Sequence, residues 1–276
     1  MSSGKTLLII SGGIEAADAA KRAKEMGHTV VVSDRAPQAP GFAFADSCLI
    51  ADVWQANDCA AAAERYNRKI RRLDGVLAAA DAPVTAANVS ARLRLAGLPL
   101  HVAELMGDRL MTRRAFLSAG VTAPWHAEIF TPQELQRAVI ARGRDLTLKP
   151  VEKLGPSTEV RLIKVDDPAA AFAQVRAASP NERVLVELVK DPLSVPAFLL
   201  NGRCTSQANE TVRALIERAT SVLGISDGPV VAQIAITDGA PQLVELSLQL
   251  GADSAFLDAA VALACGDSVS PGDLAL

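Results

Sequence analysis

The first 34 residues predict a strand, a helix and a second strand that form one βαβ unit. The apolar run "TLLII" leads into a turn at Gly12 and Gly13, and an alanine-rich stretch of helical periodicity follows and ends at Gly27. The β-rich "TVVVSD" comes next and closes on Asp34. Small alanine side chains on one helix face allow close packing on a parallel sheet. We therefore expect the N-terminal part to be an α/β fold.

The alternation of strand and helix signals continues beyond this unit. Strand signals lie at 47–52, 75–81 and 97–100, and helix signals lie at about 57–70 and 83–94. Such alternation is typical of an open parallel sheet covered by helices, and about a hundred residues is a usual size for one domain. The sequence therefore predicts a first domain that is built on a parallel sheet.

The pattern changes after this first domain, for which we predict the bounds 1–103. Residues 104–124 predict a pair of helices, which ends at Gly120 and Pro124. The remainder mixes helix signals with strand signals, one of them at 160–167, and it closes with two β-rich runs around an Asp-Gly turn. We predict an α/β fold class, with the parallel-sheet domain followed by an α+β domain at 104–276.

Composition and charge exclude several classes of function. Half of the 276 residues are hydrophobic, which is enough to fill the core of a globular protein. The 28 Lys and Arg residues face 31 Asp and Glu residues without a long run of either sign, so we expect no nucleic-acid partner. The four cysteines lie far apart, which fits neither a zinc site nor a disulfide framework. The first apolar run is too short to span a membrane, and we expect a cytoplasmic protein without a membrane partner.

One lysine stands at the end of a predicted strand and directly before a loop. Lys149 closes the alternating run "LTLK", and the loop that follows contains Gly155. This arrangement can hold phosphate groups, although a lone lysine at a strand end is more often an ordinary surface residue. Its neighbours along the chain favour the phosphate interpretation. They are the segments "GDRLMTRRAFLSAGVTAP", "RVLVELVK" and "AQIAITDGAPQLVELSLQLGAD".

These segments, in this order behind a βαβ domain, resemble the ATP-grasp superfamily. The resemblance is greatest to the carbamoyl-phosphate-synthase-like and biotin-carboxylase-like carboxylate ligases, and it covers nearly the whole chain. It implies a pre-ATP-grasp domain and two lobes, a small lobe at about 125–203 and a C-terminal lobe at about 204–276, which clamp Mg-ATP. It implies a reaction that joins a carboxylate to an amine through an acyl-phosphate. It also implies self-association, because related proteins commonly dimerise.

The resemblance also implies which residues contact the nucleotide. They are Arg109, Lys149 and Gly155 on the phosphate side, and Glu187, Leu188 and Lys190 in the hinge beside adenine. Arg109 stands where the family has a lysine, so the charge is kept and the geometry is altered. The loop after Lys149 departs further from the family pattern. Pro156 removes a backbone donor, and the carboxylate of Glu159 would repel phosphate.

The metal site is the region in which the sequence departs most from the family. The positions of its two acidic ligands and of the nearby Asn are occupied by Gln233, Glu245 and Ser247, and Gln249 replaces an arginine that often follows. One formal negative charge therefore remains of two, and Mg²⁺ prefers anionic oxygen ligands. We predict that weak binding of ATP and Mg²⁺ survives, because one carboxylate together with the nucleotide phosphates can hold Mg²⁺. We expect phosphoryl transfer to be impaired, because that step depends on charge neutralisation and positioning.

Three functions remain open at this stage. The first is a non-catalytic ATP-grasp-like protein that acts as a binding or partner subunit, with an active homologue of the same fold or a second copy of itself as the partner. The second is an active ATP-dependent carboxylate–amine ligase. The third is a nucleotide or dinucleotide sensor that uses Gly12, Gly13 and Asp34, since a glycine turn admits pyrophosphate and an acid binds ribose hydroxyls.

Overall fold

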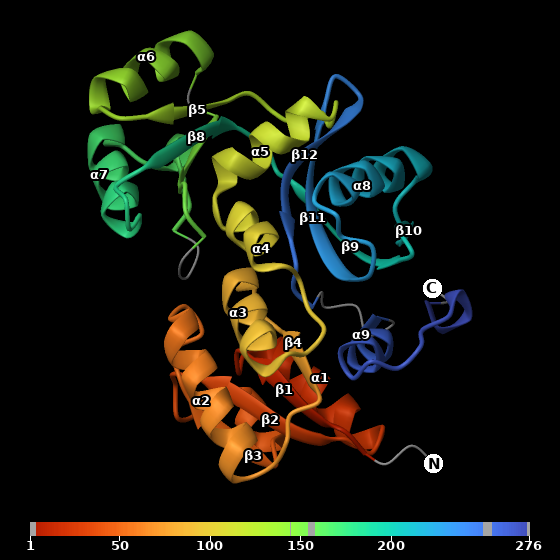
Figure 1. Cartoon of the computed structure of the whole chain (residues 1–276). Coiled ribbons are helices and arrows are strands. Elements are labelled where there is room, and N and C mark those ends of the chain that lie inside the picture. Colours follow the sequence, from red (N-terminus) through yellow and green to blue (C-terminus); the bar gives the residue numbers. More distant parts are fainter. Residues whose placement is uncertain (1–3, 144, 154–157, 251–255, 275–276) are drawn as a thin grey trace.

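The computed structural model describes residues 4–143, 145–153, 158–250 and 256–274. These residues form three four-stranded sheets with helices packed against them, and Figure 1 shows the N-terminal sheet at one end of the molecule and the two others at the opposite end. No helix within these ranges is long and apolar enough to cross a lipid bilayer.

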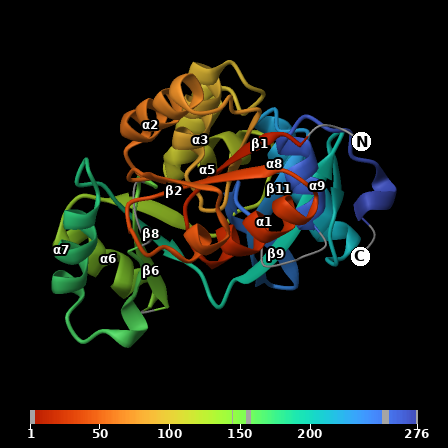
Figure 2. The ribbon, with the colours of Figure 1, turned by 90° about the horizontal axis from the view of Figure 1, so that it is seen from below.

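The N-terminal sheet is parallel throughout, as the sequence predicted. Its strands, in spatial order, are β3 (Ser47–Ile50), β2 (Thr29–Asp34), β1 (Thr6–Ile10) and β4 (Gly75–Ala78). Its helices are α1 (Ile14–Glu25) on one face and α2 (Ala56–Lys69) and α3 (Pro83–Leu93) on the other, which Figure 2 shows. Leu7 and Ile9 of β1 pack toward α1, and Leu8 and Ile10 pack toward α2 and α3. Both faces are therefore buried, which is why the strand reads as an unbroken apolar run.

The prediction of a strand at 97–100 was wrong, because the structure contains no strand there. The chain passes through Gly97 and Pro99 and enters helix α4 (Leu100–Gly107) instead. Pro99 has φ −58° and ψ 137° at the start of the helix, and its missing N–H removes a donor that a ladder would need. Within the described residues β4 is therefore an edge strand.

The second sheet is antiparallel, as the α+β pattern predicted. Its strands, in spatial order, are β5 (His126–Ile129), β8 (Val184–Leu188), β6 (Leu146–Pro150) and β7 (Val160–Arg161), and its helices are α6 (Pro132–Arg142) and α7 (Pro168–Ala178). The prediction of a strand over 160–167 was too long. The strand ends after two residues, and the 3-10 turn η2 (Leu162–Lys164) follows it. The turn lets the Leu162 side chain enter the core with Phe172 and Val175 of α7.

The third sheet is also antiparallel. Its strands, in spatial order, are β10 (Arg203–Thr205), β9 (Leu193–Leu200), β11 (Gly228–Thr237) and β12 (Ala240–Ser247), and it packs with α5 (Arg109–Ser118) and α8 (Glu210–Val222). The predicted hairpin turns at Asp238 and Gly239, whose φ angles of 51° and 78° are those that an Asp-Gly turn favours. β9 lies within the range expected for the small lobe, yet it pairs with β11 in this sheet. The domain bounds stay a prediction.

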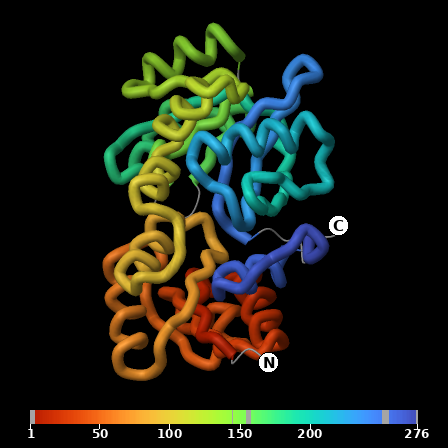
Figure 3. Tube along the Cα trace, turned by 45° about the vertical axis from the view of Figure 1, so that its right-hand side comes forward, coloured from red at the N-terminus to blue at the C-terminus, as the bar shows by residue number. Residues whose placement is uncertain are grey.

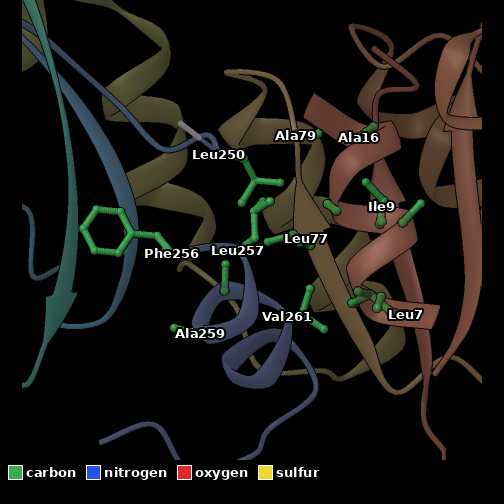
Figure 4. Close-up of a cluster of buried hydrophobic side chains, with 14 of the residues drawn as sticks. Leu7, Ile9, Ala16, Leu77, Ala79, Leu250, Phe256, Leu257, Ala259 and Val261 are labelled. Atoms are coloured by element: carbon green, nitrogen blue, oxygen red, sulfur yellow. The ribbon is translucent and has the colours of Figure 1, made fainter. Parts of the chain in front are cut away.

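The C-terminal segment packs back against the N-terminal sheet. Figure 3 shows it beside the first strands and helix, and Figure 4 shows Leu257 and Val261 of α9 (Leu257–Ala264) among Leu7, Ile9 and Leu77. The Ala264 carbonyl passes so close to β4 that a Cβ at Gly75 would lie 2.1 Å from its oxygen. Residues from both ends of the chain therefore build one core.

This close approach predicts a selective loss of stability for Gly75→Ala. The added methyl cannot be accommodated without moving α9 away from β4, so we expect a loss of about 1 to 3 kcal/mol or more in urea unfolding. Gly107→Ala is the matched control, because its added Cβ meets no described atom nearer than 3.5 Å and should cost less than about 0.5 kcal/mol. Equal stability of the two variants would show that α9 does not depend on Gly75.

Candidate functional site

A cavity of about 500 Å³ lies where the N-terminal sheet meets the two antiparallel sheets. Trp54 and Asp81 line it from the N-terminal part, Lys149 and Glu159 from β6 and the segment before β7, and Glu245 from β12. Its size is that of a small-molecule site, and its position between structural units is a usual one for such a site. This cavity is the candidate functional site, and we refer to it as the cleft.

The strand register places the expected metal positions together in the cleft. Gln233 and Glu245 are direct partners across β11 and β12, so their side chains share one face of the sheet. Ser247, two residues farther along β12, lies on the same face, and all three line the cleft with Gln249. The Lys149 ammonium is 3.8 Å from the Glu245 carboxylate. The structure therefore brings together the phosphate-side lysine and the metal-side residues that the resemblance implied.

Lys149 is already paired with carboxylates of its own chain. Its Nζ lies 2.8 Å from Glu187 and 3.4 Å from Glu159, and its side chain is 8% exposed. Burial alone would lower the pKa of this ammonium, but Glu187, Glu245 and Glu159 outweigh that effect and raise the pKa. Lys149 is therefore charged, and its charge is balanced by the protein.

Lys153 is a residue of the cleft that the sequence did not identify. Its Nζ donates to Glu245 Oε1 at 2.8 Å, to Asp81 Oδ2 at 3.0 Å and to the Leu246 carbonyl at 3.1 Å. Burial tends to lower the pKa of its ammonium, and Asp81 and Glu245 raise it overall. The sequence shows Lys153 only as a polar loop residue after Pro150, because the groups that it contacts lie far away along the chain.

Glu245 is surrounded by positive charge. The Arg109 Nε is 3.3 Å away, Lys153 Nζ is 2.8 Å away and Lys149 Nζ is 3.8 Å away. Burial would raise the pKa of this carboxyl, but Lys153, Arg109 and Lys149 outweigh burial and hold the pKa far below its usual range. Arg109 also donates to the Pro150 carbonyl at 2.9 Å. The carboxylate of Glu245 is thus ionised and fully compensated by the chain.

The residues at the expected metal positions do not fit Mg²⁺. Within the described ranges no cluster of three or more His, Cys, Asp or Glu residues is arranged to hold a metal ion. The Gln233 amide donates to Ser194 Oγ at 3.2 Å, and Glu245 is held by cations. A divalent ion would lie beside the ammonium of Lys153, and like charges at that distance repel strongly in a buried site.

Two of the expected hinge residues, Glu187 and Leu188, are the last residues of β8, and Lys190 lies after the strand. The Glu187 side chain is 1% exposed and pairs with Arg113 at 2.9 Å, while the Leu188 N–H donates to the Trp125 carbonyl. The Lys190 ammonium pairs with Asp145 at 2.8 Å and is 70% exposed, away from the cleft lining. Adenine contacts through this backbone stay a prediction. Gly155 and Pro156 lie outside the described residues.

The glycine turn of the N-terminal sheet is closed by the protein's own groups. The Gly12 N–H donates to Asp34 Oδ2 at 2.7 Å, and Asp34 Oδ1 accepts from the Ala36 N–H at 2.8 Å. A Cβ at Gly12 would lie 2.6 Å from the Ala39 Cβ, so the glycine serves a close internal approach. Asp34, which the sequence suggested as a ribose ligand, therefore accepts hydrogen bonds from backbone N–H groups of the protein itself.

The sequence matches no protein-family model and no curated protein. Several solved structures match it over almost its whole length. One is an L-amino acid ligase from Bacillus licheniformis, with a TM-score of 0.74 and 18% identity over 96% of this chain and 75% of that chain. Another is a carboxyaminoimidazole ribonucleotide synthase from Aspergillus clavatus complexed with ATP, with a TM-score of 0.76 and 13% identity over 99% of this chain and 80% of that chain.

A third match is an N5-carboxyaminoimidazole synthetase from Staphylococcus aureus complexed with ADP, with a TM-score of 0.73 and 14% identity over 98% of this chain and 79% of that chain. At these identities the matches define the fold. The chain has the ATP-grasp fold, with a parallel-sheet domain and antiparallel sheets, as the sequence resemblance implied.

The cation shell around Glu245 predicts a large effect of Glu245→Gln on stability. Removing this charge leaves Arg109, Lys149 and Lys153 close together without their shared carboxylate, so we expect a loss of about 3 to 5 kcal/mol in urea unfolding. The control is Glu210→Gln, whose partner is Arg213 and whose side chain is 83% exposed, and its loss should stay below about 0.5 kcal/mol. A small loss for both would contradict a central role of Glu245.

Proposed function

We propose that this protein is a non-catalytic ATP-grasp-fold protein that acts by binding. The observation that carries the proposal is the compensation of Glu245 by Lys153, Arg109 and Lys149. Phosphoryl transfer in proteins relies on metal ions that neutralise the developing charge on phosphate. In this cleft the carboxylate that would hold such an ion is neutralised by the chain itself.

The charge of the cleft also opposes a polyphosphate. Among the described residues that line it, the cations Arg109, Lys149 and Lys153 number three, and the carboxylates Asp81, Glu152, Glu159 and Glu245 number four. A triphosphate would therefore meet a lining without excess positive charge. To contact Lys149 it would have to displace Glu159 and compete with the buried Glu187, and breaking a buried ion pair costs about 3 to 5 kcal/mol.

The binding role that we propose is that of a partner subunit. A well-packed fold whose predicted metal position is held by internal ion pairs keeps the shape of a ligase while its charged groups are engaged with one another. The partners that we propose are an active protein of the same fold or a second copy of this chain. Mixing with an active protein of the same fold tests the first partner, and light scattering of this chain alone tests the second.

The competing function is an ATP-dependent carboxylate–amine ligase. The observation that favours it is the likeness to the Aspergillus and Staphylococcus proteins, which are complexed with ATP and ADP. Lys149 and Arg109 also face one cleft, as a phosphate site would need. Nucleotide binding and ADP release distinguish the two functions.

Calorimetric titration with ATP, with and without Mg²⁺, tests the proposal directly. We expect a dissociation constant weaker than about 1 mM, no increase in affinity with Mg²⁺, and no ADP release with carboxylate and amine mixtures. The physical reason for the weak affinity and the missing Mg²⁺ effect is that the Lys153 ammonium already pairs with Glu245. Micromolar binding of Mg-ATP together with ADP release would replace the proposal with the ligase function.

A repaired variant provides the positive control for this titration. Gln233→Glu and Ser247→Asn restore an anionic and a neutral oxygen, and Lys153→Ala removes the competing ammonium. The combined variant should bind Mg-ATP about five- to a hundred-fold more tightly than the wild type, and Lys149→Ala in that background should undo much of the gain. The first two changes without Lys153→Ala should produce little effect.

A further inference from the structure

The open side of the edge strand β4 faces a cavity of about 430 Å³ that is separate from the cleft. Val76, Leu77 and Ala78 of β4 line this cavity. Within the described residues the backbone of β4 pairs with β1 alone, so its N–H and C=O groups that point away from β1 have no partner in the chain. Backbone groups in partly buried positions are nearly always hydrogen-bonded in native proteins. This edge therefore offers donors and acceptors to a ligand.

The walls of the cavity come from other parts of the chain. The segment 96–99 lines one side, and Ala260, Leu263 and Ala264 of α9 line another. The turn at 224–229, between α8 and β11, completes the lining together with Leu248. We call this cavity the edge slot. It lies beside the segment for which the sequence predicted a strand, and no strand of the described chain takes the place next to β4.

The edge slot carries almost no charge. Among the described residues that line it, Asp227 is the one charged group. Its Oδ1 accepts from the Asn201 N–H at 2.9 Å, and its Oδ2 accepts from Ser226 Oγ. A charged ligand would lose its hydration in the slot without gaining an unengaged partner. The lining therefore fits an uncharged ligand with small or apolar side chains.

The opposite edge of the same sheet lacks such walls. Strand β3 ends beside a cavity whose lining includes four charged side chains, those of Arg35, Asp52, Asp58 and Arg65. Both edges present backbone groups, but only the edge of β4 combines them with apolar walls among the described residues. Strand β3 is therefore an internal control for β4.

We propose that the edge slot binds an extended, uncharged segment of a partner protein, which pairs with β4 as a fifth strand of the N-terminal sheet. The inference rests on the proposed function, because it identifies a surface through which a partner subunit is held. Hydrogen bonds to the β4 backbone supply the affinity, and the walls of the slot select the side chains. The four residues of β4 span about 13 Å, so a segment of similar length matches it.

The test uses the uncharged peptide acetyl-Ser-Val-Ala-Val-Thr-amide and the full-length wild type. By amide NMR we expect a dissociation constant on the order of 1 mM or lower. At about ten times that concentration, hydrogen exchange of the β4 amides that point away from β1 should slow by about ten-fold, because exchange requires the peptide-free state. The amides of β3 should keep their exchange rates.

A peptide methylated on its three central nitrogens is the first control. It keeps the side chains and loses the donors that a β ladder needs, so it should bind at least about ten-fold more weakly. This control does not depend on the folding of a protein variant.

The second control is a pair of matched protein variants. Ala96→Trp places a bulky side chain at an exposed position of the slot lining and should weaken peptide binding by about ten-fold or more. Ala91→Trp makes the same change at an exposed position of α3 outside the slot and should leave binding unchanged.

The outcomes separate this inference from the proposed function. Unchanged exchange of β4 at millimolar peptide would overturn the inference, as would equal slowing at β3 or equal binding by the methylated peptide or by Ala96→Trp. ADP release by the wild type would overturn the proposed function and would leave the peptide result unaffected. A failed peptide test without ATP binding would remove this surface and leave the non-catalytic function in place.

Discussion

The ion pair between Lys153 and Glu245 is the interaction on which the cleft depends. It places an ammonium 2.8 Å from Glu245, the carboxylate at a predicted metal position, and it also includes Asp81 of the N-terminal part. A buried charge without a partner is costly, so each of these groups stabilises the others only while all are present. The cleft is thus held together by ion pairs within the chain itself.

The fold supports this closed arrangement from several directions. Helix α9 completes the core of the N-terminal sheet, so the two ends of the chain are packed together. Lys149 and Glu187 extend the ion-pair network into the second sheet, where Arg113 is buried beside them. Movement of one sheet relative to another would separate charges that have low exposure. Such a network opposes movement of the sheets relative to one another.

Much of the fold could be predicted from the sequence, because strands buried on both faces leave apolar runs and helices leave a 3.6-residue period. The strand expected at 97–100 failed because Pro99 starts a helix there. The pairing of Gln233 with Glu245 follows from the hairpin register, so the expected metal positions do meet in space. Lys153 could not be predicted, since its partners Asp81 and Leu246 are 72 and 93 residues away and leave no local pattern.

A crystal structure of the wild type, grown with Mn²⁺ and a non-hydrolysable ATP analogue, tests the central claim most directly. Anomalous scattering locates Mn²⁺, which takes the same oxygen ligands as Mg²⁺. We predict no anomalous peak within coordination distance of Glu245 and a Lys153 ammonium still in contact with Glu245 and Asp81. A Mn²⁺ peak bound to Glu245 and to the phosphates of the analogue, with Lys153 displaced, would contradict it.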